Sequence, residues 1–224
     1  MTVVKDKKCI KYFLVAGIIL LCLYSNALAD LFIPIFDDVY YGNLVDMFVA
    51  IASAVIWGIE VVALMFVCKQ IRVELFAPKS SKGKELQTWQ VILLFVLTIL
   101  PMLIVSACIN WKVKIVYALG VKVTTVGLVC NVCEILAYAV RMVLMIMFIV
   151  CIQKGFEMIF KTKYVIPYGA IFALLTFGLI DFFVLTMDLR LFYLVMSFLY
   201  GIIYLVADKK FMTTWALCYL IYLL

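Results

Sequence analysis

Four ionisable residues of this sequence, Glu60, Glu134, Arg141 and Asp181, lie inside long apolar runs. A charged side chain at the centre of a membrane helix costs at least ~2.5–3.5 kcal/mol, so each of these residues needs a partner or a function. Two carboxylates that share a proton can carry out acid–base chemistry, including hydrolysis. Because Glu134 and Asp181 fall at matching depths of two consecutive predicted helices, we identify them as a candidate carboxylate pair.

A polar face begins at Glu134. Glu134, Tyr138 and Arg141 are spaced i, i+4 and i+7, which places them on one side of a helix. A purely structural interpretation fits the same residues: Arg141 neutralises Glu134 or pairs with Glu60, and Asp181 is protonated or capped. A third interpretation is a proton or cation path through these residues, as in a small transporter subunit.

Eight cysteines supply a second set of reactive groups. The segment 130–133, with the sequence CNVC, places Cys130 and Cys133 one helical turn apart. With Asp181 and Cys218 they are a candidate zinc or copper site, because thiolates bind these metals without histidine. Cysteines inside apolar helices otherwise behave as small hydrophobic residues, and we expect neither a metal nor a cofactor here.

Several classes of protein are excluded by what the sequence lacks. It has no histidine, the commonest metal ligand and general base. It has no Gly-rich phosphate loop, GxSxG elbow or HExxH motif, which excludes P-loop ATPases, α/β-hydrolases and zincins. The net charge of +6 is spread over loops between apolar runs, so no basic groove for nucleic acid is expected.

The composition identifies the elements that must position these residues. The chain is 69% hydrophobic and 14% charged, against about 45–50% and about 25% in soluble domains. Its mean hydropathy is +1.24, which indicates an all-α integral membrane protein with one transmembrane domain over residues 1–224. A membrane-spanning helix needs ~20 apolar residues. The predicted spans, seven in number, are 12–29, Asp46–Cys68, Trp89–Ile109, Leu128–Ile152, Tyr164–Thr186, Leu189–Val206 and the short Phe211–Leu224.

Two segments have more than one interpretation. The run 12–29 follows a basic start and ends in small residues before Asp30, so it is either the first span or a cleaved signal peptide. The moderately apolar segment Lys114–Gly127 contains Lys122, Thr124 and Thr125. It fits an interfacial or re-entrant segment better than a further span, because irregular backbone at membrane depth must be covered by protein.

The distribution of Lys and Arg predicts the orientation, since cytoplasmic loops carry the excess of cations. With the N-terminus in the cytoplasm, fourteen cations fall inside: Lys5, Lys7, Lys8, Lys11, Lys69, Arg72, Lys79, Lys82, Lys84, Lys154, Lys161, Lys163, Lys209 and Lys210. Four fall outside: Lys112, Lys114, Lys122 and Arg190. We therefore expect a multi-pass protein of the cell membrane with a cytoplasmic N-terminus.

Three short segments lie on later predicted helices: 133–138 (CEILAY), 177–181 (FGLID) and 218–222 (CYLIY). In order and spacing they are similar to the motifs EExxxR, FxxxH and HxxxN. These motifs mark the CPBP (Abi) family of CAAX-processing-like intramembrane proteases and bacteriocin-immunity proteins. Residues 129–224 thus resemble the motif-bearing half of that family, although only Glu134 and Phe177 keep its motif residues.

The resemblance implies a membrane scaffold whose catalytic groups are lost. In the family a glutamate pair activates water, while His and Asn residues bind the scissile carbonyl. Here Cys133 stands at the first Glu position, Asp181 and Cys218 at the His positions, and Tyr222 at the Asn position. A carboxylate at residue 181 would repel the developing oxyanion. General-base catalysis by Glu134 alone would give about 10²–10⁴-fold, far too little for peptide hydrolysis.

The resulting function hypothesis is a catalytically degenerate, immunity- or regulator-like bacterial protein that binds a membrane peptide, lipid or protein partner. The alternative is an active intramembrane endopeptidase that uses Glu134 and Asp181, assisted by Cys218. The candidate residues of the binding cavity are Glu60, Cys133, Glu134, Tyr138, Arg141, Phe177, Asp181, Cys218 and Tyr222.

Overall fold

The structure, a computed structural model, describes residues 2–25, 42–75, 86–108, 125–160, 166–184 and 187–223. Within these ranges every regular element is a helix. The helices are α1 (Thr2–Tyr24), α4 (Gly42–Gln70), α5 (Thr88–Cys108), α7 (Thr125–Phe160), α8 (Tyr168–Ala173), the π-helical turn η2 (Leu174–Gly178), α9 (Leu179–Val184), α10 (Met187–Val206) and α11 (Phe211–Leu223).

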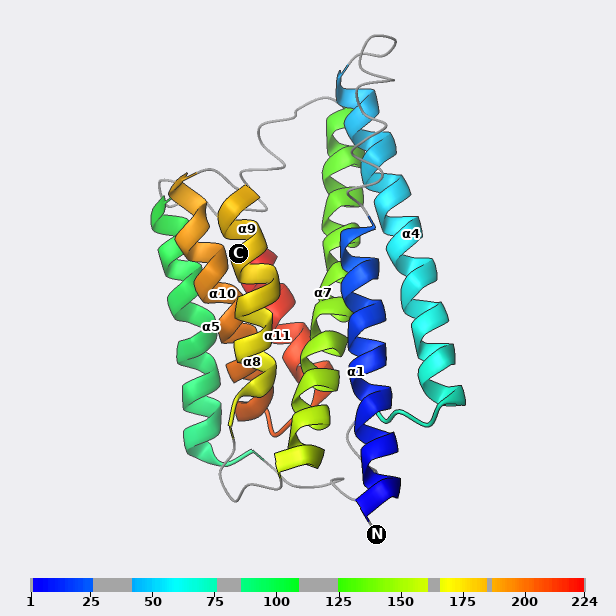
Figure 1. The fold of residues 1–224 in the computed structure, drawn as a ribbon. Coiled ribbons are helices and arrows are strands. Elements are labelled where there is room, and N and C mark those ends of the chain that lie inside the picture. Colours follow the sequence, from blue (N-terminus) through cyan, green and yellow to red (C-terminus); the bar gives the residue numbers. More distant parts are fainter. Residues whose placement is uncertain are drawn as a thin grey trace.

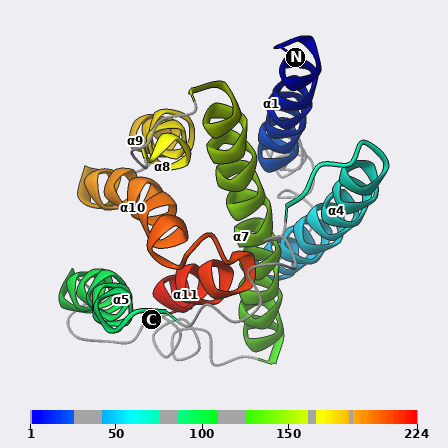
Figure 2. The ribbon, with the colours of Figure 1, turned by 90° about the horizontal axis from the view of Figure 1, so that it is seen from below.

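Helix α7 is the centre of the bundle. It packs against α1 and α4 on one side and against α8, α10 and α11 on the other (Figure 1, Figure 2). Side chains 144–153 of α7 are all buried, as expected for a helix that is apolar all round and covered by neighbours. Its 36 residues give a length of about 54 Å, well above the ~30 Å of a bilayer's hydrocarbon core.

The second group of helices is arranged around α10. Helices α8 and α9 join through η2, and α10 packs against all three segments as well as against α5 and α11 (Figure 2). Two contacts in this group require glycine. A Cβ on Gly201 of α10 would lie 2.3 Å from the Cα of Ala170, and one on Gly169 of α8 would lie 2.7 Å from the Ile149 carbonyl oxygen. Glycine thus lets backbones approach closely, as it does in membrane helix pairs.

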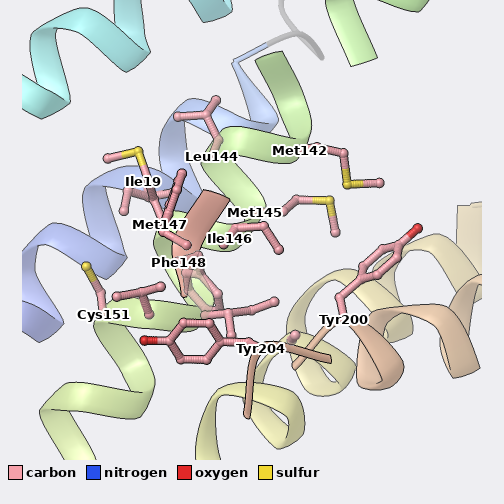
Figure 3. Close-up of a cluster of buried hydrophobic side chains, with 14 of the residues drawn as sticks. Ile19, Met142, Leu144, Met145, Ile146, Met147, Phe148, Cys151, Tyr200 and Tyr204 are labelled. Atoms are coloured by element: carbon pink, nitrogen blue, oxygen red, sulfur yellow. The ribbon is translucent and has the colours of Figure 1, made fainter. Parts of the chain in front are cut away.

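The largest buried side chains lie where α7 meets α1 and α10. Ile19 of α1 and Tyr204 of α10 approach α7 from different sides, and Phe148 of α7 lies between them (Figure 3). Ile19 and Tyr204 have no exposed surface, and Phe148 is only 3% exposed. This shared core fixes α7 relative to α1 and to α10.

Within the part of the chain that the structure describes, two helices are long and apolar enough to cross a membrane: Phe48–Gln70 within α4 and Asn131–Phe160 within α7. Shorter apolar helices cover Thr88–Ile104, Tyr168–Gly178, Tyr193–Val206 and Phe211–Leu223. The outer faces of α4 and α5 expose large apolar side chains, among them Phe66, Val62 and Phe95. Extended exposed apolar faces of this kind are typical of surfaces that contact lipid or protein.

The predicted spans and the observed helices differ mainly at two places. In the first run the helix covers Thr2–Tyr24, while residues 26–29 of the predicted 12–29 lie outside the described part. Helix α7 continues past the predicted end at Ile152 to Phe160, and in this additional part Gly155 and Phe156 pack against Phe13 of α1. Of the predicted interfacial segment 114–127, only 125–127 are described, and they begin α7.

Candidate functional site

Two of the predicted site residues meet where α7 packs against α11. The rings of Tyr138 and Tyr222 stack with their centroids 4.2 Å apart. Two side chains of α11 bond to backbone carbonyls of α7: Trp215 Nε1 donates to Ala139 O at 3.1 Å, and the Tyr219 hydroxyl donates to Ile135 O at 3.1 Å. These two hydrogen bonds hold α11 against α7 beside the stacked pair.

Arg141, one turn further along α7, contacts aromatic rings. Its guanidinium carbon lies 5.7 Å from the centre of the Trp57 ring and 5.9 Å from that of Tyr138. The buried Nε of Arg141 has no hydrogen-bond partner. Ring faces attract a cation electrostatically, and the attraction grows when water is excluded. The Arg141 guanidinium, for which the sequence suggested a carboxylate partner, thus lies next to aromatic rings of α4 and α7.

The cavity beside these residues is small. Its volume is about 40 Å³, close to the ~30 Å³ that one water molecule occupies in the liquid. It lies between α7, α10 and α11 and is lined by Tyr138, Arg141, Met142, Met145, Tyr193, Met196, Ser197, Tyr200 and Tyr222.

Glu60 is placed away from this cavity. It lies on α4 beside Ser25 and Cys22, at the end of α1, and its buried Oε2 has no hydrogen-bond partner. Trp57, one turn earlier on α4, is the residue of this helix that Arg141 contacts. The structure therefore puts an aromatic ring where the sequence analysis considered an ion pair between Glu60 and Arg141.

Phe177 belongs to the hydrophobic core and does not line the cavity. It lies on the π-helical turn η2, is 3% exposed, and packs edge-on against Phe148 with ring centroids 5.0 Å apart. The ring of Tyr24 of α1 lies 6.5 Å from it. Phe177 thus packs η2 against α7 and α1.

The remaining candidates do not form a described catalytic constellation. Cys218 is completely buried on α11, and Cys133 is half-buried on α7. Glu134 is half-buried on α7, within electrostatic range of Tyr222. The side chains of Cys130 and Asp181 lie outside the described part, so the proposed Glu134–Asp181 pair and the cysteine metal site have no described geometry. Among described residues no three Cys, Asp or Glu side chains cluster as metal ligands.

A polar junction that the sequence analysis missed joins α7 to the start of α8. Gln153 is 1% exposed. Its Nε2 donates to Glu157 Oε1 at 2.7 Å and to the Ile166 carbonyl at 2.9 Å, and its Oε1 accepts the Gly169 N–H at 2.9 Å. Lys209 Nζ also lies 2.7 Å from Glu157 Oε1. The signal in the sequence is the i, i+4 pair Gln153 and Glu157 inside an apolar run.

Cations gather at the same end of the bundle, which is the end that holds the N-terminus in Figure 1. Lys11 Nζ donates to the Ile71 carbonyl at 3.2 Å, and Lys154 Nζ donates to the Glu74 carbonyl at 2.5 Å. Both bonds fix the segment after α4, whose Arg72 has a left-handed φ of 58°. This end contains all the described residues among the fourteen cations assigned to the cytoplasm: Lys5, Lys7, Lys8, Lys11, Lys69, Arg72, Lys154, Lys209 and Lys210.

In comparisons with known proteins, no protein-family model, no curated protein and no solved structure matches the chain. The resemblance to the CPBP family therefore rests on the three sequence segments alone. The geometry of the site is the remaining basis for a function.

Proposed function

We propose that the chain is a seven-helix protein of the cell membrane, with a cytoplasmic N-terminus, that binds a partner from the bilayer without hydrolysing it. One observation carries the proposal: the cavity beside Tyr138, Arg141 and Tyr222 is small, whereas two larger hollows, one between α4, α7 and α11 and one on α4, are lined by apolar side chains. The small cavity has a volume of about 40 Å³, and the two apolar hollows have volumes of about 300 and 600 Å³.

The close packing around Tyr222 and Cys218 argues against catalysis at these positions. A hydrolase needs a base, a water and a carbonyl-binding donor around a substrate carbonyl, with reacting atoms about 3–3.5 Å apart. At the corresponding positions Tyr222 stacks on Tyr138, and Cys218 has no exposed surface. A substrate would have to displace the aromatic pair and the two hydrogen bonds that hold α11 on α7.

The two apolar hollows support the binding of a partner that approaches within the bilayer. One lies on α4 and is lined by Val55, Gly58, Ile59, Val62, Ala63 and Phe66. The other lies between α4, α7 and α11. In a membrane such surfaces face acyl chains or apolar helices, and ligands reach them by lateral diffusion within the bilayer.

The test uses the purified full chain reconstituted in lipid vesicles. It is incubated with a transmembrane peptide and with a prenylated peptide that ends in a CAAX sequence, and products are measured by mass spectrometry. We expect no cleavage above that of Glu134→Gln. Cleavage that is lost in Glu134→Gln and kept in Glu60→Gln, a matched removal of a carboxylate elsewhere, would overturn the proposal in favour of the peptidase.

A further inference from the structure

An apolar groove opens between α4, α7 and α11. Its volume is about 300 Å³, at the lower end of the range of ligand pockets. The lining is wholly apolar and consists of Val61, Met65, Leu75, Val143, Met147, Phe211, Met212 and Trp215. The one polar atom in these side chains, Trp215 Nε1, donates to the Ala139 carbonyl and needs no partner in the groove.

The groove ends at the cationic end of the bundle. Lys69 follows Met65 by one helical turn on α4, and Lys210 directly precedes Phe211 at the start of α11. Arg72 lies between Lys69 and the lining residue Leu75, and its side chain is exposed. Cations from two helices thus flank the end of an apolar channel.

Two exposed acidic residues, Glu74 and Asp208, also belong to this end. The ammonium group of Lys154 bonds to the backbone carbonyl of Glu74. Lys209 is engaged by Glu157 on the other side of α7. The three cations that flank the groove, Lys69, Arg72 and Lys210, outnumber the carboxylates of Glu74 and Asp208, so this end of the groove carries a net positive charge that attracts an anion.

A cationic end followed by an apolar groove is complementary to a molecule with an anionic head and an apolar tail. We infer that the groove holds an acyl chain of an anionic phospholipid, with its phosphate headgroup at Lys69, Arg72 and Lys210. This inference rests on the proposed function and names the partner. Acyl chains can fill a groove that offers no hydrogen-bonding group, and basic clusters at the cytoplasmic surface attract anionic headgroups. An apolar peptide helix would offer these cations no anion.

The experiment measures thermal unfolding of the full chain in neutral detergent. Phosphatidylglycerol and phosphatidylcholine with identical acyl chains are titrated separately, and inorganic phosphate serves as a third probe. We expect stabilisation by phosphatidylglycerol at concentrations at least tenfold lower than by phosphatidylcholine, and none by phosphate. Equal potency of the two lipids, or stabilisation by phosphate alone, would overturn the inference.

Variants locate the lipid. Removal of two cations in Lys69→Gln/Arg72→Gln should weaken the apparent affinity for phosphatidylglycerol about thirtyfold, at about fivefold for each cation. Lys8→Gln removes an exposed cation of α1 at the same end of the bundle but away from the groove. It should change the apparent affinity for phosphatidylglycerol less than twofold.

A second pair of variants tests the groove itself. Val61→Trp fills the groove and should abolish the preference for phosphatidylglycerol, whereas Val55→Trp fills the other hollow of α4 and should keep it. Unchanged lipid binding in Val61→Trp would overturn the inference. The peptide-cleavage assay is independent of this titration, so a failure of the proposed function is recognised separately.

Discussion

Tyr138 of α7 and Tyr222 of α11 stack face to face with their ring centroids 4.2 Å apart, in the region where the CPBP-like motifs would place a catalytic site. The guanidinium carbon of Arg141 lies over the Tyr138 ring, 5.9 Å from its centre. The cavity that both tyrosines line has a volume of only about 40 Å³. The stacking therefore links the packing of α11 on α7 to the small size of this cavity.

The stacked pair predicts measurable coupling between the two helices. Tyr138→Leu and Tyr222→Leu should each lower the free energy of unfolding, and the double variant should lose less than the sum. The coupling energy should be about 0.5–1.5 kcal/mol, as for other aromatic pairs. Denaturant unfolding in detergent micelles measures it, and strictly additive effects would contradict the stacking.

Gly201 predicts a severe effect of a single methyl group. In Gly201→Ala the new Cβ would lie 2.3 Å from the Ala170 Cα, so α8 and α10 must separate. Overpacking of this kind typically costs about 1–3 kcal/mol. Gly17→Ala is the matched control, because no atom lies within 4 Å of its Cβ position and alanine favours helix. A melting temperature of Gly201→Ala at or above that of Gly17→Ala would disprove the close contact.

Gln153 predicts a second large loss of stability. Gln153→Leu keeps the side-chain volume but leaves the Gly169 N–H and the Ile166 carbonyl without their partner. Each buried group left unsatisfied costs about 1–3 kcal/mol, so for the two groups we expect a decrease of about 2–6 kcal/mol in the free energy of unfolding. Gln70→Leu, at the exposed end of α4, should change it by less than ~0.5 kcal/mol. Similar free energies of unfolding for the two variants would show that the hydrogen bonds of Gln153 do not stabilise the protein.

The orientation predicts which ends are accessible from each side of the membrane. In intact cells a membrane-impermeant maleimide should label Val129→Cys, near the start of α7, above the signal of the unmodified chain. Arg72→Cys should be labelled only in inverted vesicles, because the segment after α4 lies at the cationic end. Labelling of both positions from the same side would contradict a crossing by α4 and α7.

The sequence predicted the helical class and most helix positions because hydrophobic length and composition are local properties. The predicted Trp89–Ile109 differs from α5 by one residue at each end, and Phe211–Leu224 begins where α11 begins. Helical periodicity also placed Tyr138 and Arg141 on a common face. The predicted span Leu128–Ile152 stops eight residues before the end of α7 at Phe160, and in this last part Gly155 and Phe156 pack against Phe13 of α1.

Only the tertiary structure decided which faces meet. Tyr222 covers Tyr138, Arg141 reaches Trp57, and Glu60 lies beside Ser25 and Cys22 at the end of α1. The sequence alone left each of these pairings open. The physical reason is that apolar composition specifies the solvent of a helix and not its neighbour: lipid tails are as apolar as leucine. Helix partners are chosen by close packing, such as Gly201 on Ala170, and by buried hydrogen bonds such as those of Gln153.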